Sequence, residues 1–277
     1  MIKTWLSIII LVFSFFGLYH DIIFKLVQDW ISDDNYSHGF LIPIIAAYLV
    51  WQRKERLSII QARPSNAGMI IFLGGLFIFL FSYIGAELFT MRFSMLIVIF
   101  GLVAFLMGIE FGKAALIPVA YLVFMIPIPA IIWNKLAFPL KLFATKMAVG
   151  TIGLLNIPVY REGNIIHLSN TTLQVVDACS GMRSLASLLA LSAAFAFITN
   201  HSKTRKWLLF ISAIPIAIFL NIVRLSVTAV LAQHYGPQSA EGFLHEFSGL
   251  FVFAFAILCL YLVHAALQKL SPVPHHA

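Results

Sequence analysis

The stretch AGMIIFLGGLFIFLFSYI, residues 67–84, carries no charged side chain and is almost entirely apolar. A helix needs about 20 consecutive apolar residues to cross the hydrocarbon core of a bilayer, and this stretch approaches that length. The same character extends to the whole chain, in which hydrophobic residues make up 61% and charged residues 10%. Soluble domains are roughly half apolar and a quarter charged, so the composition excludes a soluble globular protein and indicates a polytopic membrane protein.

Eight apolar windows, each of about 20 residues, follow one another along the chain. The first lies behind Lys3 as in a signal peptide, but residues 18–21 offer no small-residue cleavage site, so we interpret it as an uncleaved anchor. The sequence therefore predicts an all-α polytopic membrane protein of about eight transmembrane helices, built as a single integral membrane domain over residues 1–277. The windows begin near Thr4, Phe40, Ala67, Met91, Ala114, Ser180, Trp207 and His245.

The basic residues of the loops predict the orientation. Segments on one side carry ten of them, Lys3, Arg53, Lys54, Arg56, Arg63, Lys113, Lys203, Arg205, Lys206 and Lys269. The opposite segments are longer but carry six, Lys25, Arg92, Lys135, Lys141, Lys146 and Arg161. The positive-inside rule assigns the first set to the cytoplasm. We therefore expect a multi-pass membrane protein with both termini in the cytoplasm.

The longest connection, residues 132–178, is external in this topology. Its first half is apolar with three lysines, and we expect it to lie along the membrane interface as a helix broken at Pro139. Its second half predicts two short strands, residues 163–168 and 172–176, joined by a polar turn. The resulting hairpin leads directly into the sixth predicted span.

Arg224 stands inside the seventh predicted span, and an ionisable residue within a membrane is a functional hypothesis by default. It follows Trp207 by 17 residues, about 26 Å of helix, which places it near the external edge of the bilayer core. Asn221 and Thr228 share its helix face, so a polar stripe points into the bundle. The alternative is a structural arginine that snorkels outward or holds two helices together.

Cys179 begins the sixth predicted span at its external end, with Asp177 as a candidate N-cap and Arg183 one turn later. The positive end of a helix dipole and a nearby guanidinium both favour a thiolate, so this cysteine is a candidate nucleophile. The alternative is a small buried apolar residue, which is how we interpret Cys259. Cys259 lies 14 residues past His245, too deep along its helix to pair with Cys179.

His245 opens the eighth predicted span, also externally, and Glu241 lies four residues earlier, where a carboxylate orients an imidazole. A cysteine nucleophile needs such a proton carrier. His38, His167 and His234 also fall on the external side, and spacing alone does not rank the four histidines.

The orientation brings Cys179, Arg224 and His245, from three different spans, to one depth at one membrane face. A thiolate, a proton carrier and a fixed cation for an oxyanion are the minimum for acyl transfer at a cysteine. A metalloprotease site at His245-Glu246 is excluded, because Gly249 occupies the position where the motif requires its second histidine. We therefore expect no metal and no cofactor.

At these residues the sequence resembles the exosortases, membrane-embedded cysteine transpeptidases that process proteins with a C-terminal PEP-CTERM sorting signal. The similarity covers nearly the whole chain, and its most specific parts are the Ala-Cys-Ser-Gly stretch and the Asn-x-x-Arg pair. The matching stretches are residues 36–43 running to Trp51, residues 124–129, residues 161–164, residues 178–185, residues 221–224, and His245 followed by Gly249.

The resemblance implies Cys179 as nucleophile, His245 as proton-transfer partner and Arg224 as stabilising cation. Arg183, Asn221, Ser180, His38 and Glu241 are the supporting candidates. It also implies a client protein anchored by a C-terminal helix, a location in the bacterial inner membrane with the active site on the periplasmic side, contact with membrane lipid, and an acceptor related to exopolysaccharide. No basic tail or patch suggests binding to nucleic acid.

Three alternatives use the same residues differently. In the first, water is the acceptor and the site is hydrolytic. In the second, the protein is a transporter or export subunit in which Arg224 binds an anionic headgroup and a fifth span broken by Pro118, Pro127 and Pro129 forms a gate. In the third, the protein is a non-catalytic assembly scaffold.

Overall fold

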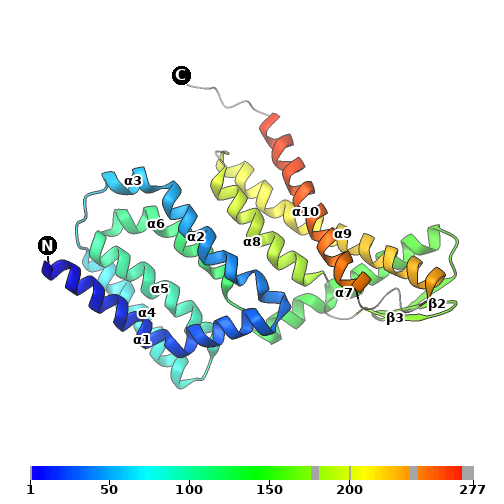
Figure 1. Cartoon of the computed structure of the whole chain (residues 1–277), viewed down its shortest axis with the longest axis horizontal. Helices are drawn as coiled ribbons and strands as arrows, with labels where there is room; N and C mark the ends of the chain where they lie inside the picture. The colour runs from blue at the N-terminus through cyan, green and yellow to red at the C-terminus, as the bar shows by residue number, and fades with distance from the viewer. Residues whose placement is uncertain (1, 176–180, 200, 237–242, 270–277) are drawn as a thin grey trace. The chain divides into compact units, whose positions relative to one another are not determined.

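The computed structural model describes residues 2–175, 181–199, 201–236 and 243–269 (Figure 1). The chain divides into two compact units, Met1–Ile128 and Pro129–Ala277, and each is described by itself. A single domain over the whole chain stays a prediction.

The first unit is a helical bundle whose closest pair is α4 and α5. The two helices approach through glycines: a Cβ on Gly68 would lie 2.2 Å from the backbone nitrogen of Phe105, and one on Gly101 2.4 Å from that of Phe72. Small residues at such contacts are typical of membrane helices, which associate by close backbone packing. The unit contains α1 (Ile2–Ser32), η1 (Asp34–Phe40), α2 (Leu41–Gln52), α3 (Lys54–Ile59), α4 (Asn66–Ile84), α5 (Leu88–Met107), α6 (Ile109–Tyr121) and η2 (Leu122–Met125).

Large apolar side chains cover the outer face of this pair. Ile70 and Phe77 of α4 are 69% and 61% exposed, while Gly75 and Ser82 of the same helix are buried. A helix that is apolar on all sides and exposes its large side chains is suited to lipid rather than to water. The first unit therefore has the surface of a membrane bundle.

The second unit combines four helices with a small sheet. Two clusters hold it together. One joins α8, α9 and α10 through buried residues such as Leu188, Ala213 and Leu260, and the other joins α7 and the sheet to the C-terminal half of α9. The unit contains α7 (Ala130–Leu154), β1 (Val159–Glu162), β2 (Ile165–Leu168), β3 (Thr172–Gln174), α8 (Met182–Ile198), α9 (Lys203–Tyr235) and α10 (Phe243–Lys269).

The predicted hairpin is present as β2 and β3, which pair antiparallel from Ile165–Gln174 to His167–Thr172. A third strand, β1, which the sequence analysis did not predict, pairs with the other edge of β2 through a two-residue turn, Gly163-Asn164. Gly163 has φ +60, the left-handed conformation that such hairpin turns require. Ile166 and Leu168 face the helices, so the sheet is anchored on α7 and α9.

The expectation that the helix breaks at Pro139 is wrong, because α7 continues through this residue from Ala130 to Leu154. Buried residues lie along one stripe on both sides of the proline, including Trp133 and Ala137 before it and Ala144 after it. Packing of this stripe keeps the two halves helical, and membrane helices tolerate proline where neighbours compensate the freed backbone group.

The described part of the chain contains five helices long and apolar enough to cross a membrane, and a sixth span results if residues 109–125 and α7 are counted together. The count of eight is therefore not confirmed, although the multi-pass helical fold is. The two predicted spans missing from this count correspond to α2, with 12 residues, and α8, with 17, since about 20 are needed to span the core. The eight-span topology stays a prediction.

Arg92 lies within a helix and not in a loop as expected. It is in the second turn of α5, is 3% exposed, and its guanidinium is 2.6 Å from the carboxylate of Asp29 on α1. A hydropathy window begins where apolar residues begin, so it does not detect a charge neutralised by a partner 63 residues away. The external side expected for Arg92 stays a prediction.

Candidate functional site

The site is centred on the polar face of α9. The guanidinium nitrogen Nη2 of Arg224 donates a hydrogen bond of 2.9 Å to Oδ1 of Asn221, one helical turn earlier. Asn221 is 2% exposed, so the amide is held in a nearly dry environment. This contact confirms that the two residues share one helix face, as the spacing predicted.

The start of α8 packs against this pair. Gly181 is the N-cap residue of α8 and has φ +81, a left-handed conformation that favours glycine. A Cβ on Gly181 would lie 2.9 Å from Cγ and 3.0 Å from Nδ2 of Asn221, so no other residue fits here without a shift. The described α8 begins at Met182, and the predicted start of the span at Cys179 lies outside the described residues.

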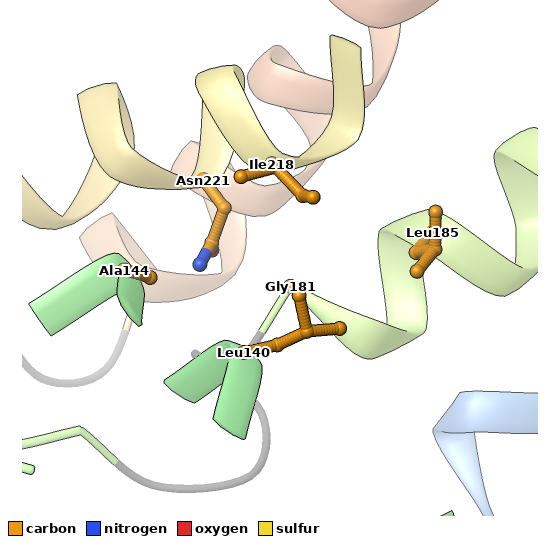
Figure 2. Close-up of a pocket in the computed structure, with 6 residues that line it drawn as sticks. All are labelled: Leu140, Ala144, Gly181, Leu185, Ile218 and Asn221. Carbon is orange, nitrogen blue, oxygen red and sulfur yellow. The ribbon is translucent and has the colours of Figure 1, made fainter. Parts of the chain in front are cut away.

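A small pocket lies where α7, α8 and α9 meet beside this contact. Among the described residues that line it, Asn221 alone has a polar side chain, and its amide nitrogen points toward the space between Ala144 and Gly181 (Figure 2). Its free volume is about 10 Å³, room for about one water molecule. The pocket is lined by Leu140, Ala144, Gly181, Leu185, Ile218 and Asn221.

The third helix at the site is α10. A Cβ added to Gly249 would lie 3.9 Å from Nη1 of Arg224, so the guanidinium is near α10 at this point and leaves just enough room for a methyl group. Gly249 comes four residues, one helical turn, after His245. Arg224 therefore bonds to the Asn221 amide of its own helix and lies near α10.

Several predicted site residues fall outside the described residues. Cys179, Ser180 and Glu241 belong to this group, as does Asp177, the predicted N-cap. The backbone of His245 lies in α10, while its side chain is outside the described part. Arg183 lies in the first turn of α8 and is partly buried.

Two of the competing histidines are placed away from Arg224. The ring of His167 stacks on Tyr160 with centroids 4.3 Å apart, its Nε2 lies 3.4 Å from Glu162, and it occupies the face of β2 opposite to Ile166 and Leu168. His234 is exposed near the end of α9, ten residues beyond Arg224, which corresponds to ~15 Å of helix.

His38 belongs to the first unit and has a structural environment there. Burial lowers the pKa of its imidazole below the usual value, although hydrogen bonds with the backbone of Phe124 and Asn35 act in the opposite direction. The neutral ring therefore helps to join η1 to η2.

The residues around His38 form the same junction. The hydroxyl of Tyr36 bonds with the backbone of Ile128, accepting from its N–H at 3.2 Å, and the indole of Trp30 donates to the carbonyl of Met125 at 2.9 Å. Gly39 lies directly on that indole, since a Cβ there would be 2.3 Å from its nitrogen. Residues 36–39 and 124–128, two of the stretches that carry the family resemblance, thus contact each other within the first unit.

The candidate site is thus a polar pair within α9, packed against the N-terminus of α8 and near α10, in a helical multi-pass membrane protein. The family model described as transmembrane exosortase matches residues 30–262, so the chain belongs to the transmembrane exosortase family. That family is of the membrane cysteine transpeptidase type, and membership makes this chain a membrane protein of sorting-signal processing. No match is found among curated proteins or among solved structures.

Sequence reasoning gave no role to Gly181 or Gly249, although both lie in the stretches that carried the resemblance. A glycine two residues after a candidate nucleophile, and another one turn after a candidate base, were the available signals. The pocket residues Leu140, Ala144 and Ile218 gave no signal. Most residues of a membrane helix are apolar, so the sequence does not distinguish those that line a pocket from those that face lipid or another helix.

Proposed function

We propose that this protein is a cysteine transpeptidase that processes C-terminally anchored client proteins at the external face of the bacterial inner membrane. Cys179 is the nucleophile, His245 transfers the proton, and Arg224 supplies the positive charge of the site. The client presents the peptide just external to its anchoring helix.

One observation carries this proposal: chain segments next to both Cys179 and His245 converge on Asn221 and Arg224. Gly181, which contacts the Asn221 amide, follows Cys179 by two residues, and two residues of chain reach at most ~7 Å. Gly249, which lies near the guanidinium, follows His245 by one turn, ~6 Å along the helix. His167 and His234 have no comparable connection to Arg224, which favours His245 as the proton carrier.

The reaction has two halves. The thiolate of Cys179 attacks the scissile carbonyl carbon, an S–C bond forms, and the carbonyl π electrons move to oxygen. When the C=O bond reforms, the C–N bond breaks and the leaving amine takes a proton from His245, leaving a thioester. The acceptor nucleophile then gives its proton to His245, attacks the thioester and releases the thiolate. A non-water acceptor makes the reaction a transpeptidation, and water makes it a hydrolysis.

The decisive experiment uses the two cysteines of the chain as a matched pair. In cells that co-express a client, Cys179→Ala should leave the client at its unprocessed size, whereas Cys259→Ala should process it normally. Mass spectrometry of the wild-type reaction should find a client acyl group on Cys179 and an adduct on the new C-terminus of the product. Processing by Cys179→Ala would refute the proposal and favour a transporter or scaffold, whereas a free carboxylate alone would identify a hydrolase.

A further inference from the structure

The Asn221 amide has a defined orientation. An arginine guanidinium only donates hydrogen bonds, so the amide atom 2.9 Å from Nη2 of Arg224 must be the oxygen. The amide nitrogen is then on the other side of the group, where it points toward the pocket between Ala144 and Gly181 (Figure 2). Arg224 thereby determines that an N–H donor, rather than a carbonyl, faces this pocket.

The pocket has the size and polarity that a single charged oxygen requires. Its free volume is about 10 Å³, so it accommodates one oxygen atom with little room to spare. Leu140, Leu185 and Ile218 give the described lining an apolar character, and a hydrogen bond is electrostatically stronger in such a low-dielectric environment than in water. Gly181 at its edge lies two residues from the proposed nucleophile.

We infer that the side-chain amide of Asn221 is the oxyanion donor of the reaction and that Arg224 is the positioning residue that aims it. This inference rests on the proposed function. When the thiolate attacks, the carbonyl oxygen gains the electron pair and enters the pocket, where the N–H of Asn221 stabilises it. When the C=O bond reforms and the amine leaves, the oxygen loses this charge, so the interaction is strongest in the transition state, as catalysis requires.

The inference assigns different tasks to the two ends of the guanidinium. Nη2 holds the Asn221 oxygen, and Nη1 lies near Gly249 of α10. Arg224 therefore orients the donor from a position beside the helix that carries His245.

The test separates oxyanion stabilisation from correct placement of the thiol. In a Cys259→Ser background, alkylation of Cys179 by iodoacetamide reports a reactive thiolate without forming an oxyanion, whereas cleavage of a reconstituted client requires one. Asn221→Asp keeps an oxygen for Arg224 but removes the N–H donor, and Asn221→Ala removes both without adding a charge. Alkylation is measured at the pH where its rate reaches a plateau, so a shifted thiol pKa does not affect the comparison.

We expect both variants to lower the rate of client cleavage by about 10²–10³-fold, the loss found when one oxyanion donor is removed, while the plateau alkylation rate stays within about twofold. Arg224→Lys, which retains a donor for the Asn221 oxygen, should cleave faster than Arg224→Ala. Unchanged cleavage, or a parallel fall of cleavage and alkylation in both variants, would overturn the inference.

The two proposals fail in different ways. If Cys179→Ala still processes the client, the proposed function is wrong whatever the Asn221 variants do. If Cys179→Ala is inactive and both Asn221 variants cleave at the wild-type rate, the function stands and the assignment of Asn221 is wrong.

Discussion

Arg92 and Arg224 are both arginines within apolar helices, and their surroundings differ. Arg92 of α5 is 3% exposed and forms an ion pair with Asp29 of α1, so its charge joins two helices of the first unit. Arg224 of α9 donates to the neutral amide of Asn221 and lies near Gly249 of α10. An arginine within a membrane helix is therefore not a functional residue by default, because its role depends on the groups that surround it.

Exchange of each arginine for alanine should give opposite results. Arg224→Ala should lower client cleavage by about 10²–10³-fold with little change in thermal unfolding, because it removes the control of the oxyanion donor. Arg92→Ala should lower the unfolding temperature and leave cleavage per folded molecule unchanged, because it leaves Asp29 without its cation. Unfolding in detergent and cleavage of a reconstituted client measure the two effects. An equal fall in unfolding temperature for both variants would contradict the distinction between a functional Arg224 and a structural Arg92.

Gly181→Ala tests the contact between the start of α8 and Asn221 in the second unit. The substitution places a Cβ 2.9 Å from Asn221 Cγ, so the amide must move, and we expect a fall in cleavage of about tenfold to a hundredfold. Gly163→Ala is the matched control: its φ is also positive, at +60, but nothing lies within 4 Å of the added Cβ. Both should lose about 1–2 kcal/mol from the left-handed backbone, and only Gly181→Ala should lose activity. A control variant with the same loss of activity would contradict this explanation.

Asp29→Asn tests the ion pair of the first unit directly. It leaves the buried guanidinium of Arg92 facing a neutral group, and we expect a loss of about 2 kcal/mol in the free energy of unfolding, below the 3–5 of fully buried pairs because Asp29 is 40% exposed. The double variant Asp29→Leu, Arg92→Met should recover most of this stability, since an apolar pair of similar volume has no charge to desolvate. A double variant less stable than Asp29→Asn would show that the charges themselves are required.

The smallest effect concerns His38 and pH. Burial lowers the pKa of His38 in the folded chain, so the unfolded chain binds the proton first as the pH falls below about 6.5. The stability contributed by the neutral ring is therefore complete above that pH and is lost as the pH falls toward the folded pKa. His38→Gln, which keeps a hydrogen-bond donor, should reduce the slope of unfolding temperature against pH between about 7 and 5. An unchanged slope would show that His38 does not titrate in this window.

The sequence predicted the class of fold and one face of the site, because both depend on local pattern. Hydropathy marked the long helices, and a three-residue spacing put Asn221 beside Arg224. The ion pair of Arg92 with Asp29 and the continuity of α7 through Pro139 were not predictable, because each depends on packing between elements distant in the chain. The pocket beside Asn221 was equally hidden, since it arises where α7, α8 and α9 meet.

Strand β1 was missed for a different reason. Val159–Glu162 is too short for a clear alternation of apolar and polar residues, and its partner had already been assigned to another hairpin. The turn Gly163-Asn164 was the local signal for it, because a glycine with φ +60 fits a two-residue connection between antiparallel strands.

The length of α9 has a mechanical consequence. Its 33 residues measure ~50 Å, about 20 Å more than the hydrocarbon core of a bilayer, and Arg224 stands ~32 Å from its first residue. In the proposed orientation the distance along this helix places Arg224, and with it the reaction, at the boundary between lipid and water. A client can then be cleaved just external to its anchoring helix while that helix stays in the bilayer, so no energy is needed to move the helix out of the lipid.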